Sequence, residues 1–139
     1  MKPHNLLRAA AEVTFAHALL NTFAGLLGGT SHVQDEQAIL NAMKSVQFDA
    51  MGSLRTYWHF YFGFGLFLSV SLLLRSVLIW QLAALAKADP AKARIFIASL
   101  CIAFVAFSVL SSVYFFIAPV VLEGVIALLL GLAYAGARK

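Results

Sequence analysis

The chain alternates long apolar runs with short polar segments, at a spacing that predicts transmembrane helices. No Asp, Glu, Lys or Arg occurs within residues 13–34, 56–74, 95–122 and 124–137. A helix needs about 20 mostly apolar residues to cross the hydrocarbon core of a bilayer. We therefore predict an all-α fold, an integral membrane four-helix bundle forming a single transmembrane domain over residues 1–139. Its spans are expected at about 5–28, 54–86, 92–117 and 119–137.

Pro119 separates the last two predicted spans. Residues 95–137 contain one charged residue, Glu123, and as one helix they would be about 65 Å long, about twice the thickness of the hydrocarbon core. Proline lacks a backbone N–H and suits the first turn of a helix. We therefore expect the chain to fold back just before Pro119.

The segment between the first two spans, residues 29–53, has helix signals of its own. Ser31 and Gln34 have the spacing of a capping box, and Gly52 suits the end of a helix. Apolar side chains recur at helical spacing: Ile39, Met43, Val46 and Ala50. These signals predict a short amphipathic helix over about 32–50 in an outer loop. It would act either as a lid that holds the first two spans together or as a gate over a pocket.

Composition and charge place the predicted helices in a membrane with one orientation. The chain is 62% hydrophobic and 12% charged, whereas a soluble domain is about 25% charged. The net charge of +4 comes from residues at the ends of apolar runs, so no nucleic-acid partner is predicted. Seven basic residues fall on one side: Lys2, Arg8, Lys87, Lys92, Arg94, Arg138 and Lys139. By the positive-inside rule both termini are cytoplasmic, in the inner (plasma) membrane.

The stretch "LRTYWHFYFGFG", residues 54–65, gathers aromatic side chains at the start of the second span. Trp and Tyr are common at the membrane–water interface because each ring has an apolar body and a polar tip. Gly63 and Gly65 would let another helix approach closely. Two interpretations stay open: an interfacial belt with a packing face, or the aromatic wall of a binding pocket.

Polar side chains from several spans are expected to converge in the outer third of the membrane. Glu123 lies one turn into the last span, at the depth expected for the start of the second. A salt bridge between Glu123 and Arg55 is one interpretation. The other is a ligand-binding site, for which the candidate residues are His59, Glu123, Arg55, Trp58, Tyr61, Asn21 and Tyr114.

A second set of ionisable groups is expected nearer the inner side. Charges inside a membrane are costly, so each needs a partner or a purpose. We predict an intramembrane charge pair between Glu12 and Arg75, with Arg8 on the same face as Glu12. The alternative for Glu12 is a proton-coupled carboxylate. His17 is expected to be a hydrogen-bonded packing residue.

Motifs for soluble enzyme chemistry are absent from the sequence. It has no glycine-rich phosphate loop, nucleophile elbow or cysteine pair. We interpret Cys101 as a packing residue. The histidines are too few and too scattered to predict a metal site. We predict no cofactor and assign no catalytic residue. The expected role is non-catalytic: binding or moving a small apolar or amphipathic molecule, or serving as an accessory membrane subunit. The expected partners are the lipid bilayer and that ligand. The sequence leaves open whether the protein also forms a homo-oligomer.

Three resemblances accompany this interpretation. Through "MGSLRTYWHFYFGFGL" and "WQLAALAKADP" the chain resembles small bacterial four-helix inner-membrane proteins, DoxX-like in outline, which implies the fold but no activity. Through Glu12 in "AAAEV" it resembles small multidrug resistance transporters, although residues 29–53 are longer than their loops; this implies proton-coupled transport. Trp58, His59 and Glu123 are chemically similar to the site of sterol-isomerase-like membrane enzymes. This last resemblance implies acid–base catalysis by Glu123 and His59 on a lipid-like substrate.

Overall fold

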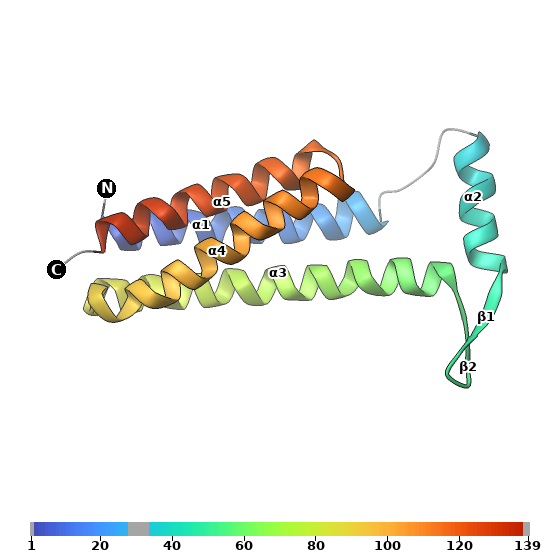
Figure 1. Cartoon of the computed structure of the whole chain (residues 1–139), viewed down its shortest axis with the longest axis horizontal. Coiled ribbons are helices and arrows are strands. Elements are labelled where there is room, and N and C mark those ends of the chain that lie inside the picture. The colour runs from blue at the N-terminus through green and yellow to red at the C-terminus, as the bar shows by residue number, and fades with distance from the viewer. Residues whose placement is uncertain (1, 28–33, 138–139) are drawn as a thin grey trace. The chain divides into compact units, whose positions relative to one another are not determined.

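The computed structural model describes residues 2–27 and 34–137. In chain order its elements are α1 (Pro3–Leu19), the π-helix η1 (Leu20–Leu27), α2 (Gln34–Ser45), β1 (Gln47–Ala50), β2 (Ser53–Thr56), α3 (Tyr57–Ala88), α4 (Pro90–Tyr114) and α5 (Ile117–Gly136) (Figure 1). Four stretches are long and apolar enough to cross a membrane: Pro3–Leu27, Tyr57–Ala88, Pro90–Tyr114 and Ile117–Gly136. The prediction of a mainly helical chain with four such helices is confirmed.

Local sequence signals set the helix ends on either side of α4. Asp89 caps its N-terminus, because one carboxylate oxygen accepts a hydrogen bond from the Lys92 backbone N–H at 3.0 Å, and Pro90 follows as the first helical residue. At the other end α5 begins at Ile117, so Pro119 lies in its first turn. The predicted fold-back at this proline is confirmed.

A β-hairpin stands where helix was predicted. β1 pairs antiparallel with β2 through a two-residue turn, Met51 and Gly52, whose φ angles of 54° and 83° define type I′ geometry. The Asp49 carboxylate accepts the Gly52 backbone N–H at 2.7 Å. Gly52 is therefore a turn residue and not a helix terminator.

The hairpin corrects two predicted boundaries. The helix predicted over 32–50 ends at Ser45, and the span predicted from residue 54 begins at Tyr57. The tight turn, which glycine enters without steric cost, lets the residues around it pair as strands. Ser31 and the first two residues of the predicted 32–50 helix lie outside the described residues.

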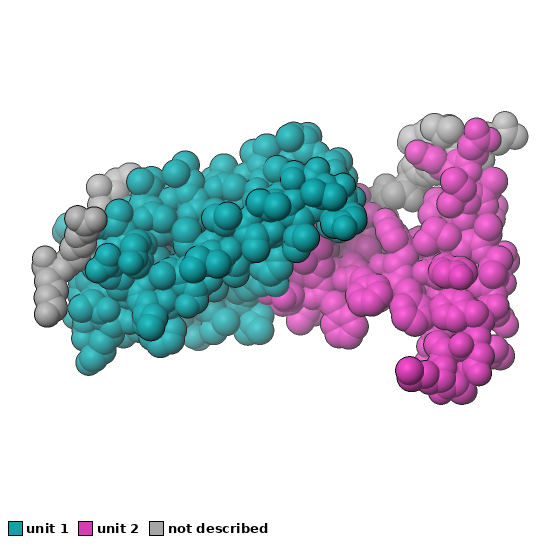
Figure 2. Space-filling view, viewed as in Figure 1, with its two compact units in different colours: residues 1–17, 72–139 teal, residues 18–71 magenta. Residues whose placement is uncertain are grey.

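The chain divides into two compact units (Figure 2). Unit 1 comprises residues 1–17 and 72–139, and its core draws on α1, α3, α4 and α5. Three short polar side chains bond across helices in this unit. The Ser76 hydroxyl donates to the Ala11 carbonyl (2.9 Å), Ser108 to Val120 (3.0 Å) and the Cys101 thiol to Ala127 (3.4 Å). Small residues of this kind let membrane helices approach closely.

Unit 2 comprises residues 18–71, including η1, the hairpin and the first part of α3. The Asn21 amide donates to the Gly65 carbonyl (3.1 Å) and to the Ser69 hydroxyl (2.9 Å), which ties η1 to α3. The Leu26 side chain occupies the space that a Cβ on Gly65 would need, whereas Gly63 faces open space. Gly65 alone of these two glycines therefore provides the predicted close approach.

Candidate functional site

Four polar side chains, one from each long helix, interact in unit 1: His17 (α1), Arg75 (α3), Ser111 (α4) and Glu123 (α5). We call them the polar cluster. Arg75 interacts electrostatically with both His17 and Glu123. Ser111 makes a side-chain hydrogen bond to the Glu123 carboxyl group. Apolar residues dominate all four helices, so the cluster is a local concentration of polarity in a hydrocarbon-like interior.

Arg75 rests on aromatic rings. Its guanidinium carbon lies 4.2 Å from the Phe107 ring centroid and 5.9 Å from that of Phe104. This cation–π arrangement is favourable when the ring and the cation are removed from water. The guanidinium donates no hydrogen bond to another described residue, and the side chain is only half-buried. Its five N–H donors are therefore free for an acceptor from outside the chain.

Glu123 and His17 each bury a polar atom without a partner. Both residues are only 5% exposed. Glu123 Oε2 and His17 Nδ1 form no hydrogen bond with the described part of the chain; Arg94 Nε, outside the polar cluster, is a third buried atom without a partner there. An unsatisfied buried polar atom costs about 1–3 kcal/mol, so such atoms in a protein call for a ligand, a water molecule or a proton. The cluster thus combines free donors on Arg75 with open positions on a carboxylate and an imidazole.

The ligand-site residues predicted from the sequence are divided between the two units. Glu123 and Tyr114 belong to unit 1, and Tyr114 is 75% exposed at the end of α4. The other five belong to unit 2: His59, Arg55, Trp58, Tyr61 and Asn21. Arg55 is exposed and donates to its neighbour's carbonyl, Leu54 O, at 2.9 Å. Their convergence on one site stays a prediction, and Glu123 is engaged by Arg75 and Ser111.

His59 has a structural role at the start of α3. Its backbone N–H donates to the Thr56 hydroxyl (3.3 Å), and the Thr56 backbone N–H donates to His59 Nδ1 (3.1 Å). This reciprocal pair has the geometry of a capping box, with histidine in the place usually taken by Glu or Gln. The Nδ1 atom of this imidazole is therefore an acceptor for the backbone, which fixes the ring at the start of α3.

The remaining predicted aromatic residues form a ring cluster in unit 2. Trp58 packs against Tyr61 and Phe62, with centroids 5.6 and 5.8 Å apart, and the Lys44 ammonium lies 4.6 Å from the Trp58 ring. Phe48 of the hairpin packs against Tyr57 at 4.9 Å. These contacts join α2, β1 and α3, as expected from a packing cluster.

The predicted charge pair between Glu12 and Arg75 is not formed. No ion pair joins Glu12 to Arg75 in the described part of the chain, whereas Lys92 and Asp89 form one. Arg75 lies close enough to Glu123 for an electrostatic interaction, although no ion pair joins the two side chains, and Glu12 is exposed. Arg8 lies with its guanidinium carbon 5.3 Å from the Trp80 ring centroid.

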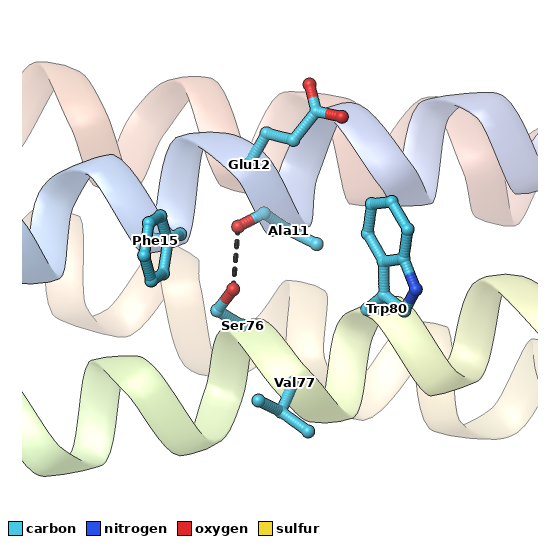
Figure 3. Close-up of a pocket in the computed structure, with 6 residues that line it drawn as sticks. All are labelled: Ala11, Glu12, Phe15, Ser76, Val77 and Trp80. Carbon is cyan, nitrogen blue, oxygen red and sulfur yellow. Dashed lines mark hydrogen bonds between the residues drawn. The ribbon is translucent and has the colours of Figure 1, made fainter.

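Glu12 borders a groove on the surface of unit 1, between α1 and α3. The groove measures about 330 Å³ and is lined by Ala11, Glu12, Phe15, Ser76, Val77 and Trp80. Figure 3 shows Phe15 and Trp80 on either side of the Ser76–Ala11 hydrogen bond, with the Glu12 carboxylate pointing away from that bond. A second groove of about 440 Å³, between α3 and α4, has a mainly apolar lining.

Sequence reasoning missed Ser111 and Phe107 and assigned Arg75 to the wrong carboxylate. A usable signal was present: Arg75 and Glu123 interrupt different spans with opposite charges, and intramembrane charges usually pair with one another. Ser111 and Phe107 resemble other residues of their helix and carry no such signal. No group of three or more His, Cys, Asp or Glu able to hold a metal ion occurs among the described residues.

The helices and the buried cluster indicate the class of multi-pass helical membrane proteins. The chain matches no protein-family model, no curated protein and no solved structure.

Proposed function

We propose that this protein binds a small amphipathic molecule within the membrane, with the polar head of that molecule at the polar cluster. The observation that carries the proposal is the pair of buried, unpartnered atoms, Glu123 Oε2 and His17 Nδ1, beside the free donors of Arg75. Polar groups inside a membrane are costly and commonly mark ligand or ion sites. Non-catalytic binding fits better than acid–base catalysis by Glu123 and His59, because Glu123 interacts with Arg75 and Ser111 in the polar cluster, whereas His59 Nδ1 caps the start of α3.

The charges of the polar cluster favour a particular kind of head group. A cationic head would meet Arg75, and an anionic head would meet Glu123, so each would face a like charge in a medium of low dielectric constant. An uncharged head that both donates and accepts hydrogen bonds satisfies Arg75, Glu123 and His17 together. The apolar surroundings of the cluster suit a hydrocarbon tail.

The proposal includes a location and an orientation. The protein is a single transmembrane domain in the inner (plasma) membrane, with both termini and the α3–α4 loop cytoplasmic. The support is the bias of Lys and Arg toward one side, since positively charged loops remain in the cytoplasm. In this orientation α2 and the hairpin face the outside.

Thermal unfolding of the detergent-solubilised protein tests the binding site. Three probes with the same twelve-carbon tail differ in the head: monolaurin (uncharged), lauric acid and dodecylamine. We expect monolaurin to raise the Tm most, because its uncharged head meets no like charge at the polar cluster. A ligand at a hundredfold excess over its Kd stabilises a protein by about 2.7 kcal/mol. Glu123→Gln and Arg75→Gln should each reduce that shift.

Arg94→Gln is the matched control. Arg94 also belongs to unit 1 and also lies over an aromatic ring, 4.4 Å from the Tyr134 centroid, but outside the polar cluster. Its replacement should leave the monolaurin shift unchanged. Equal shifts for all three probes, or equal shifts in wild type and in both cluster variants, would refute the site.

A further inference from the structure

Glu12 is an exposed carboxylate well inside a candidate membrane span. The candidate span begins at Pro3, and Glu12 follows Pro3 by nine residues, which is about 13 Å along α1. In a hydrocarbon core about 30 Å thick, Glu12 is therefore expected well below the membrane surface. Its side chain is exposed and makes no hydrogen bond or ion pair with any described residue. A carboxylate facing lipid at this depth is strongly unfavourable and needs a partner.

Arg8 provides a complementary charge one helical turn earlier. It is also exposed, and its guanidinium lies over Trp80 without donating to a described acceptor. Residues four apart share one face of a helix. This face therefore presents one cation and one anion, together with the exposed side chain of Phe15.

We propose that the Arg8–Glu12 face of α1 is the contact surface for a second copy of this chain within the membrane. A two-fold axis along the membrane normal would bring Arg8 of each copy toward Glu12 of the other, forming two equivalent ion pairs. The two positions differ in depth by about 6 Å, which an extended arginine and a glutamate bridge together. The axis also keeps both copies in one orientation. This surface is independent of the polar cluster and goes beyond the proposed function.

The groove beside Glu12 supports a helix–helix contact. Ala11 and Ser76 are small residues of the lining, and Phe15 and Trp80 stand on either side of them (Figure 3). Small residues let a second helix approach closely, and aromatic side chains on both sides can pack against it. The surface thus combines charge complementarity with space for side chains of the partner subunit.

Charge reversal tests the pairing between copies. Sedimentation equilibrium in density-matched detergent should show a wild-type dimer. Arg8→Glu and Glu12→Arg should each weaken association by about tenfold, because like charges then meet at the contact. When the two variants are mixed in equal amounts, heterodimers should make up well over the half of all dimers that random pairing gives. An ion pair within one chain would give no such preference.

Lys87→Glu is the control, a charge reversal at the exposed end of α3 that should leave association unchanged. Disulfide cross-linking provides evidence that needs no change of charge. In a Cys101→Ala background, Phe15→Cys should form covalent dimers in membranes, whereas Ile102→Cys, exposed on α4, should not. A monomeric wild type, random pairing in the mixture, or equal cross-linking at the two positions would each overturn the proposal.

Discussion

The interaction between Arg75 and Glu123 makes the sharpest prediction about stability. Replacing Arg75 by Met leaves the Glu123 carboxyl group, 5% exposed, with only the Ser111 hydrogen bond. Breaking a buried pair by removing one partner costs about 3–5 kcal/mol. We expect about 3 kcal/mol for Arg75→Met, at the lower end because Arg75 is half-buried and interacts with Glu123 without forming an ion pair.

The reciprocal change, Glu123→Gln, should cost less. Glutamine keeps the shape of the side chain and can still bond to Ser111, and the half-buried Arg75 retains its ring contact with Phe107. We expect a loss of about 2 kcal/mol, since a partly exposed charge is cheaper to leave unpaired. The double variant should lose about 3 kcal/mol rather than 5, because neither charge is then stranded; the coupling energy is about 2 kcal/mol.

The free energy of unfolding can be measured in mixed micelles with increasing dodecyl sulfate. Circular dichroism reports the helices, and Trp80 fluorescence reports unit 1 in a Trp58→Phe background. Ser111→Ala provides a comparison in which only a hydrogen bond to the carboxyl group is lost. Additivity of the two single variants to within about 0.5 kcal/mol would refute the electrostatic interaction between Arg75 and Glu123.

Three further predictions test other parts of the fold. Gly65→Ala should destabilise the protein by about 1–3 kcal/mol, because the added Cβ clashes with the Leu26 side chain. Gly63 faces open space, so Gly63→Ala should be neutral or stabilising by up to about 1 kcal/mol. Equal stability of the two variants in the same micelle assay would show that η1 does not pack on α3. The hydrogen bonds from Lys92 to the capping carboxylate hold the pKa of Asp89 below its ordinary value of 3.8. The cap therefore stabilises α4 above about pH 4 and is lost as pH falls through the lowered pKa, so the Tm of wild type should fall more than that of Asp89→Asn between pH 5 and pH 3, and parallel curves would contradict this role. Finally, a membrane-impermeant maleimide should label Asp35→Cys in intact cells but Lys92→Cys only after permeabilisation, both in the Cys101→Ala background; the reverse pattern would invert the proposed orientation.

The helix content of the chain could be read from the sequence because it depends on local properties. Uncharged runs of sufficient length favour helices in lipid whatever their neighbours are, since only an internally hydrogen-bonded helix satisfies their backbone. Pro119 and Asp89 mark helix starts through chemistry contained within one turn. The hairpin was missed because its turn has Met51 before Gly52, in place of the Asn or Asp that usually signals type I′ geometry.

Only the tertiary structure decided which side chains on different helices interact with one another. The sequence shows that Glu12, Arg75 and Glu123 each interrupt a span, but the rotation of each helix decides which charges meet, and a rotation of one residue moves a side chain by about 100°. The packing of α1, α3, α4 and α5 around a shared core turned Arg75 toward Glu123 and left Glu12 on the surface. In the same way, only the folded chain revealed that His59 caps a helix, because that role requires the backbone of Thr56 to turn back toward the imidazole.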